Sequence, residues 1–337
     1  MDIGWGTTLT IKTVIVLAVV PLTALILGYI FLLKMMSHMQ SRLGPMDPGG
    51  FHGWYQLVGD GIKFLQKEDI MPAEADKRVF ALAPAVVVLS TFLVFVVIPA
   101  GPRMVVRDLD VGVFYALAVS SLSVIGVLMA GWASSNKYAL MGALRAAAQL
   151  IAYELPLLLA TVGVVVQAGT MSLNGIVLQQ QNGSIFGWSG IGQPYILTQF
   201  VGFALFLVAA QAELTQTPFD MPVAESELVA GYMVEYTGFR FLFFFIGEFG
   251  TAFAFAALAA TLFLGGYAIP GVYGDWANIL GPFVLFAKLM IVAFLMFWVR
   301  FTYPRLREDQ LQAVAWKFLI PIGLANILLT GLFKVAF

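Results

Sequence analysis

The acidic residues between positions 213 and 248 are the part of this sequence most suited to chemistry. Six of the nineteen Asp and Glu residues fall there, with Arg240 as the only base among them. The six are Glu213, Asp220, Glu225, Glu227, Glu235 and Glu248. A carboxyl group exchanges protons near neutral pH when burial or a neighbouring negative charge raises its pKa. The cluster therefore indicates proton transfer, and Glu227 and Glu235 would share a helix face if a helix began near Glu225.

Three charged residues stand inside apolar stretches of the sequence. Glu154 lies within 146–168, Glu248 within 236–264 and Lys288 within 281–300. A charge at such depth in a bilayer costs several kcal/mol, and it normally faces the interior of a helix bundle or a water path. We interpret these residues, together with the loop acids, as a proton relay. Its members are Glu154, Glu213, Glu225, Glu227, Glu235, Glu248 and Lys288. The alternative is that Glu154, Glu248 and Lys288 form static ion pairs that fix helix packing.

The composition indicates a membrane protein, whose helices would position these charged groups. Hydrophobic residues make up 60% of the 337 positions and charged residues only 11%, and the mean hydropathy is +0.90. A soluble domain carries roughly 25% charged residues. Apolar segments of a length that can span a bilayer, about 20 residues, occur at 13–33, 79–99, 111–132, 146–168, 195–213, 236–264, 281–300 and 317–334. We therefore expect an all-α polytopic membrane protein with about eight transmembrane helices, forming a single membrane domain over 1–337. The first segment is expected to be a retained helix because no basic n-region precedes it.

The distribution of Lys and Arg predicts the orientation. Thirteen of the eighteen basic residues lie in or beside the connections on one side, which places that side in the cytoplasm and both chain ends outside. The cytoplasmic connections include a first loop at 34–78 and an acidic loop at 213–240. Within the first loop, apolar residues recur at helical spacing from Trp54 to Leu65, which predicts an amphipathic helix. This helix either lies at the lipid headgroups or forms the wall of a cavity, with Asp60 turned inward.

Several kinds of site are excluded by the residue types present. The chain has no cysteine, so it offers no disulfide, no thiolate zinc site and no iron–sulfur ligands. Two histidines, His38 and His52, make a histidine-ligated haem pair improbable. A net charge of −1 does not support nucleic-acid binding driven by bulk charge. We therefore expect no metal site, and any redox cofactor must lie in a partner protein.

Three long segments resemble one protein family. They are GWASSNKYALMGALRAAAQLIAYE at 131–154, ELTQTPFDMPVAESELVAGYMVEYTGFRF at 213–241 and WVRFTYPRLREDQLQAVAWKFLIP at 298–321. Together with KEDIMP at 67–72, they resemble the H-subunit family of bacterial respiratory complex I, the proton-pumping NADH:quinone oxidoreductase. The family is homologous to subunit 1 of the mitochondrial enzyme. The resemblance extends from about residue 34 to the C-terminus.

The resemblance implies a function within a larger complex. Members of the family are eight-helix bundles in the bacterial inner or plasma membrane, and their cytoplasmic loops close a quinone chamber against peripheral-arm subunits. Quinone, either ubiquinone or menaquinone, would be reduced in this chamber. FMN and the iron–sulfur clusters would lie in partner subunits, so this chain alone would hold no complete active site and bind no cofactor. Its acids would couple quinone reduction to proton translocation through the neighbouring small and antiporter-like membrane subunits.

The resemblance also suggests residues of the quinone chamber. They are Arg42, Gln56, Asp60 and Asp220. The same resemblance places six of the glutamates at the family's coupling positions and matches Lys288 to a membrane lysine. The first loop departs from the family pattern: Leu32 and Leu33 stand where the family usually has Glu-Arg, and Met46 and Asp47 where it has Asn-Arg.

Three other functions are compatible with parts of this pattern. The first is the homologous membrane subunit of an energy-converting hydrogenase, which needs no quinone. The second is an autonomous ion transporter, although such proteins usually contain internal repeats and the sequence shows no convincing one. The third is a passive membrane anchor, for which the buried acids would have no explanation.

Overall fold

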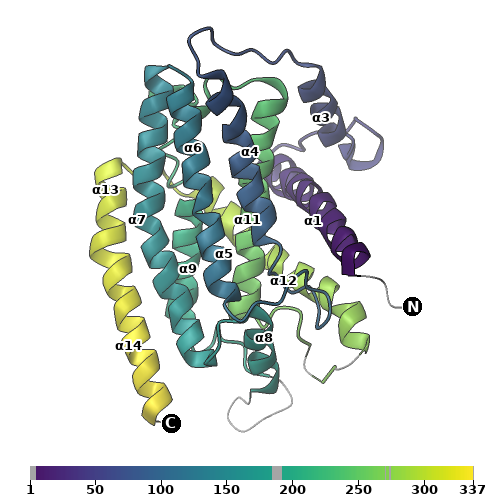
Figure 1. The fold of residues 1–337 in the computed structure, drawn as a ribbon, viewed down its shortest axis with the longest axis vertical. Helices are drawn as coiled ribbons and strands as arrows, with labels where there is room; N and C mark the ends of the chain where they lie inside the picture. Colours follow the sequence, from purple (N-terminus) through teal and green to yellow (C-terminus); the bar gives the residue numbers. More distant parts are fainter. Residues whose placement is uncertain (1–4, 184–191, 270, 273–274, 337) are drawn as a thin grey trace.

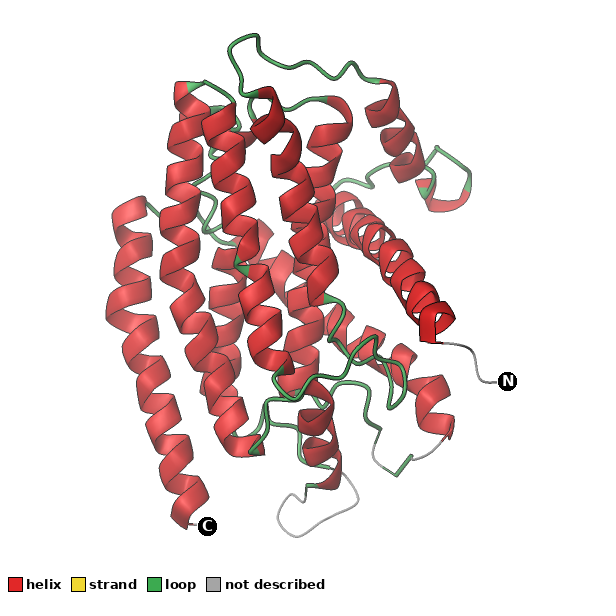
Figure 2. Cartoon of the chain, viewed as in Figure 1, coloured by secondary structure: helices red, strands yellow, loops and turns green. Residues whose placement is uncertain are grey.

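The computed structural model describes residues 5–183, 192–269, 271–272 and 275–336. Within these residues the chain is helical and forms no strand (Figure 2). The prediction of an all-α polytopic membrane protein is confirmed.

The longer helices form a bundle (Figure 1). Their bounds are α1 Trp5–Leu27, α4 Lys77–Val94, α5 Gly112–Ser120, α6 Leu122–Ala133, α7 Lys137–Ala168, α9 Phe200–Glu213, α11 Gly238–Phe263, α12 Asp275–Thr302 and α14 Ile320–Ala336. The shorter helices are α2 Met36–Met39, α3 Gln56–Gln66, α8 Leu173–Asn182, α10 Glu225–Leu228 and α13 Glu308–Ala313, with 3-10 turns at Phe51–Gly53 and Gly231–Met233. Single π-helical stretches, Gly28–Met35 and Val314–Leu319, join α1 to α2 and α13 to α14. The first helix is therefore continuous to Met39, and residues 34–39 of the expected first loop are helical.

Seven helical stretches among the described residues are long and apolar enough to cross a membrane. The expected span at 195–213 is shorter than predicted, because its helix is α9, which has 14 residues. The residues before α9 form a turn that pairs with the end of α11, since the amide of Ile196 donates to the carbonyl of Phe263 at 2.8 Å. The sequence pattern could not distinguish an apolar turn from the first turn of a helix.

The helices place the connections at two opposite ends of the bundle. The connection that contains α3, and the turn between α6 and α7, lie at one end, called the α3 end below (Figure 1). Helix α8 and the end of α14 lie at the other end. Helix α11 runs through the interior and is almost continuously buried from Phe249 to Phe263. Helix α14 instead presents exposed Leu324, Leu328 and Leu332, as expected of a surface that faces lipid.

The amphipathic helix predicted in the first loop is α3. Its apolar residues Val58, Ile62 and Leu65 are exposed, while Phe64 stacks on Phe241 of α11 with ring centroids 5.7 Å apart. One side of α3 is therefore attached to the bundle, and an apolar side remains uncovered in this chain.

Candidate functional site

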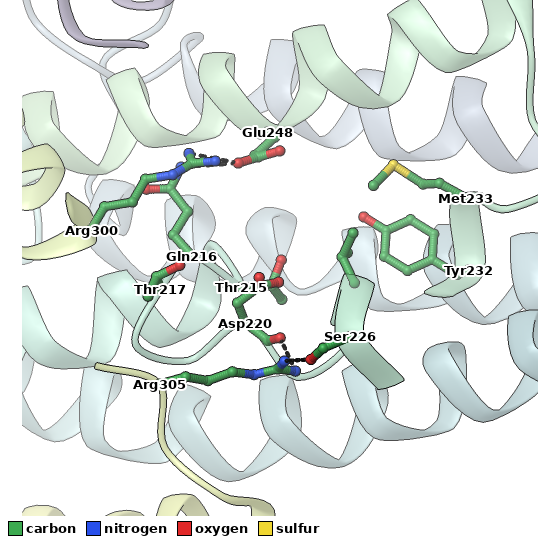
Figure 3. Close-up of a pocket in the computed structure, with 11 residues that line it drawn as sticks. Thr215, Gln216, Thr217, Asp220, Ser226, Tyr232, Met233, Glu248, Arg300 and Arg305 are labelled. Carbon is green, nitrogen blue, oxygen red and sulfur yellow. Dashed lines mark hydrogen bonds and ion pairs between the residues drawn. The ribbon is translucent and has the colours of Figure 1, made fainter. Parts of the chain in front are cut away.

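A polar cavity of about 370 Å³ lies between the connection 214–237 and the helices α11 and α12 (Figure 3). It is lined by Thr215, Gln216, Thr217, Asp220, Val223, Ser226, Tyr232, Met233, Glu248, Arg300 and Arg305. We call it the large cavity, by contrast with the narrower one that adjoins it. It brings together two of the predicted acids, Asp220 and Glu248, with two arginines from the end of α12 and the segment after it.

Glu248 forms an ion pair across this cavity. Its Oε1 atom accepts from Nη1 of Arg300 at 3.1 Å and from Nε2 of Gln216 at 3.2 Å. The guanidinium group of Arg300 also lies over the rings of Phe249 and Phe297, 5.8 and 5.9 Å from their centroids. The charge of this acid is therefore compensated by a cation that the surrounding rings hold in place.

The other arginine of the cavity fixes the acidic connection. Nη2 of Arg305 donates to the backbone carbonyl of Asp220 at 2.7 Å, and Nη1 donates to the hydroxyl of Ser226 at 3.3 Å (Figure 3). The amide of Leu306 donates to the carbonyl of Pro218 at 3.1 Å. The segment after α12 thus holds the side of the cavity that contains Asp220.

A narrower cavity of about 50 Å³ adjoins the large one and contains Glu213. Thr215, Tyr232 and Glu248 line both cavities, so the two meet at these side chains. Glu213 is 9% exposed, and its Oε2 atom has no hydrogen-bond partner among the described residues. Glu154 of α7 lies close enough for its negative charge to act on Glu213. Asp220 and Glu248 thus line the large cavity, Glu248 and Glu213 line the narrow cavity, and Glu154 lines neither of them.

Gln149 of α7 positions the start of this connection. The side chain is fully buried, and its Nε2 atom donates to the carbonyls of Ala212 and Phe219, both at 2.7 Å. These two carbonyls stand on either side of the turn that follows α9, so one amide group fixes the turn that carries Glu213.

The remaining loop acids lie apart from these cavities. Glu227 is exposed and accepts from Nη1 of Arg145 at 2.6 Å. This hydrogen bond lowers the pKa of Glu227, and the charge of Arg305 acts in the same direction. Glu235 accepts from Nδ2 of Asn136 at 2.6 Å and lines a separate cavity of about 460 Å³ at the α3 end. The side chain of Glu225 lies outside the described residues.

The expectation that Glu227 and Glu235 share a helix face is wrong. Helix α10 ends at Leu228, a 3-10 turn follows at Gly231–Met233, and α11 begins only at Gly238. Val229 and Gly231 adopt positive φ values of 65° and 54°, which interrupt any continuous helix between the two acids.

Lys288 does not pair with Glu154. Its Nζ atom donates to the carbonyls of Gly266 and Ala268, at 2.9 and 3.0 Å, just beyond the end of α11. It lines a third cavity of about 300 Å³ that contains none of the acids. Of the alternative static ion pairs, the structure therefore contains one for Glu248, with Arg300, and none between Glu154 and Lys288 among the described residues.

The chamber residues suggested for the first loop lie away from the large cavity. Arg42 is exposed, and its Nε atom donates to Oε1 of Gln40 at 2.8 Å. Gln56 donates to Asp60 at 3.1 Å along α3. Of the four suggested residues, Asp220 alone lines the large cavity among the described residues.

Of the eleven residues that line the large cavity, the sequence identified Asp220 and Glu248 as site residues, and the other nine were not identified. Gln216, Tyr232 and Arg300 all fall within the segments that carry the family resemblance. In the sequence, Arg300 stands out only as a base that marks the end of a span. Its position at the end of the span that contains Lys288 can be read from the sequence. Only the fold shows that Arg300 faces Glu248.

The fold and the site define a class of protein, a polytopic helical membrane protein with a charged cavity near one end of its bundle. A model of the NADH dehydrogenase family matches residues 11–331. The chain is 47% identical over 312 residues to the H subunit of NADH-quinone oxidoreductase from Bacillus thuringiensis subsp. konkukian (strain 97-27), covering 90% of this chain and 87% of that protein. Proteins of the same name from Bacillus cereus (strain AH187) and Bacillus anthracis (strain A0248) are 46% identical over the same shares. The chain belongs to the NADH dehydrogenase family and, within it, to the H subunits of NADH-quinone oxidoreductase.

Proposed function

We propose that this chain is the membrane subunit through which an NADH-quinone oxidoreductase couples quinone reduction to proton translocation. The chain would form the quinone chamber together with peripheral-arm subunits at the α3 end. It would bind no FMN or iron–sulfur cluster itself, and would adjoin the small and antiporter-like subunits in the bacterial plasma membrane. The names of the relatives, together with the seven apolar helices among the described residues, support this assignment.

One observation carries the coupling part of the proposal. The large cavity and the narrow cavity share three lining residues, so acids that are distant in sequence border adjoining spaces. Asp220 and Glu248 line the first, and Glu213 and Glu248 line the second. Protons move between acids along paths of polar side chains and water, and charged groups at membrane depth usually mark such paths.

The positions of the other suggested residues support two different roles. Glu227 and Glu235 lie at the α3 end, where peripheral subunits would attach, and each already has a hydrogen-bond partner within the chain. Arg42, Gln56 and Asp60 belong to the first loop and α3, which would form the entrance side of the chamber. Lys288 donates hydrogen bonds to backbone carbonyls just beyond the end of α11. It would influence the relay only by fixing the backbone conformation there.

The hydrogenase, transporter and anchor alternatives receive less support. The relatives described above are all named as subunits of an NADH-quinone oxidoreductase. A passive anchor would leave the cavity with its paired Glu248 and Arg300 unexplained.

The proposal is tested on the complete complex, purified through a tag on this chain from the organism that encodes it. We expect FMN- and iron–sulfur-bearing partners to co-purify, and the complex to reduce quinone with NADH and acidify the lumen of inside-out proteoliposomes. Glu213→Gln should lower quinone reduction and proton translocation together. NADH oxidation by ferricyanide should remain, because that acceptor takes electrons before the quinone site.

A matched control makes the same chemical change elsewhere. Asp110→Asn alters an exposed carboxyl group outside both cytoplasmic loops that lines none of the cavities described here, and should retain both activities. A tagged preparation that assembles but contains no NADH-oxidising partner would contradict the proposed function. Equal activities of Glu213→Gln and Asp110→Asn would instead remove Glu213 from the relay.

A further inference from the structure

Tyr232 stands at the junction of the two cavities. It belongs to the short turn Gly231–Met233, and it is one of three residues that line both cavities. Figure 3 shows its hydroxyl directed into the large cavity, between Glu248 on one side and Asp220 on the other. The residue therefore lies beside the place where the two cavities meet, within reach of a proton that passes from one to the other.

The ring of Tyr232 is held in place, which fixes the direction of the hydroxyl. It packs edge-on against Phe244 of α11, with ring centroids 5.5 Å apart. The preceding Gly231 adopts a positive φ of 54°, and an added Cβ atom there would lie 1.7 Å from the carbonyl oxygen of Pro222. Only glycine fits at that position, so the turn that presents Tyr232 is determined by the backbone.

The charges around Tyr232 keep its phenol protonated. Burial, and then the negative charges of Glu248 and Asp220, raise the pKa of this phenol above its ordinary value. A protonated phenol can donate its hydrogen to one acid while it accepts a hydrogen from another group.

The acid on the inner side lacks the contacts that the others have. Glu248 is bound by Arg300 and Gln216, whereas the Oε2 atom of Glu213 has no partner among the described residues. A buried carboxyl oxygen without a partner costs free energy, so the narrow cavity is a place where a proton donor is needed.

We propose that the Tyr232 hydroxyl carries protons between the large cavity and the narrow cavity that contains Glu213. This inference rests on the proposed coupling function and adds a residue to it. In each transfer the phenol gives its proton towards one acid as it receives another from the opposite side. Its O–H bond is broken and remade, so the residue is unchanged and no oxidant or reductant is needed. Tyr232 is thus a proton-carrying residue in the path.

The test compares three variants of the assembled complex. Tyr232→Phe removes only the hydroxyl and retains the contact with Phe244, so the chain should still fold and assemble. Tyr236→Phe is the matched control: its hydroxyl donates to the carbonyl of Phe80 at 3.2 Å, and it lines neither cavity. Thr215→Val removes the other hydroxyl at the junction.

We expect Tyr232→Phe to lower the turnover of NADH:quinone reduction and the proton translocation rate by about tenfold, somewhat less than the range usual for one proton-transfer group. The KM for quinone and the ferricyanide rate should stay unchanged, and the solvent deuterium isotope effect on turnover should increase. Tyr236→Phe should remain within about twofold of the wild type, which is less than about 0.5 kcal/mol of barrier, and Thr215→Val should lose less activity than Tyr232→Phe.

Wild-type turnover in Tyr232→Phe would overturn the inference, and so would a larger loss in Thr215→Val. A loss in Tyr232→Phe with an unchanged isotope effect would show a structural role and would also overturn it. Each of these outcomes leaves the proposed function standing, because that function is judged on the wild-type complex, by its partners, its quinone reduction and its proton translocation.

Discussion

Replacing Arg300 tests how far its positive charge stabilises the carboxylate of Glu248 in the large cavity. Arg300→Met keeps a long side chain against Phe249 and Phe297 but removes the positive charge beside Glu248. Among the described residues, the carboxylate then keeps the hydrogen bond from Gln216 alone. A partly buried charge without its partner destabilises a protein more than the absence of the whole pair does.

The magnitude follows from the distance and the exposure of the pair. Unit charges about 4 Å apart attract each other by about 4 kcal/mol at an effective dielectric constant of about 20. The side chains of Arg300 and Glu248 are 22% and 29% exposed and border a cavity, so solvent screens part of this attraction. We therefore expect a coupling free energy of about 1–2 kcal/mol between them.

The assay is a double-mutant cycle. The measured quantity is the temperature at which the assembled complex loses half of its NADH:quinone reductase activity. For variants without this activity, it is the temperature at which the complex loses half of its subunit content. Arg300→Met should lower this temperature by about 2–4 °C per kcal/mol. Adding Glu248→Gln should restore most of the difference, because the unpaired charge is then removed. Additive losses in Arg300→Met and Glu248→Gln would refute the reasoning, since the two side chains would then not interact.

Three further outcomes test other contacts of the site. The pairing of Glu227 with Arg145 lowers the pKa of this carboxyl group, so the pairing stabilises the folded chain above the ordinary pKa of 4.5, and this stabilisation is lost as pH falls through the lowered pKa. Glu227→Gln should therefore lower the inactivation temperature slightly at pH 7. The same substitution should have no effect at a pH below the lowered pKa. Gln149→Leu should destabilise the chain by about 2–4 kcal/mol, because two buried carbonyls lose their donor, and the yield of assembled complex reports this loss. A stability defect in Glu154→Gln should not be cured by Lys288→Met, because Lys288 donates to backbone carbonyls; recovery in the double variant would contradict the structure.

The helical architecture could be predicted because it depends on composition and periodicity. Long apolar runs specify helices in lipid, where every backbone polar group must be satisfied internally. The amphipathic period from Trp54 to Leu65 likewise predicted α3. The exception was the segment before α9, where an apolar run includes a turn that pairs with the end of α11. Hydropathy records apolarity and not hydrogen-bond pairing, so it could not detect that turn.

The acids could be selected from the sequence, but their partners could not. Glu248 meets Arg300, which is 52 positions later, and Glu227 meets Arg145, which is 82 positions earlier. Periodicity relates only residues that share one helix, so contacts between distant helices are invisible to it. The same limit explains why Tyr232 was not identified: it stands in a turn, and its importance comes from the two cavities that meet at its side chain.

The distribution of compensating charge separates the two cavities physically. The large cavity contains Asp220 and Glu248 together with Arg300 and Arg305, so its acids and bases are equal in number among the described lining residues. The narrow cavity contains Glu213 and Glu248 and no base among its described lining residues, and the charge of Glu154 acts on Glu213 from α7. No arginine or lysine side chain among the described lining residues of the narrow cavity compensates the negative charge of these acids. A proton can enter this cavity because it neutralises the acid that it reaches, so the proposed proton transfer is compatible with a narrow cavity that contains acids and no base among its described lining residues.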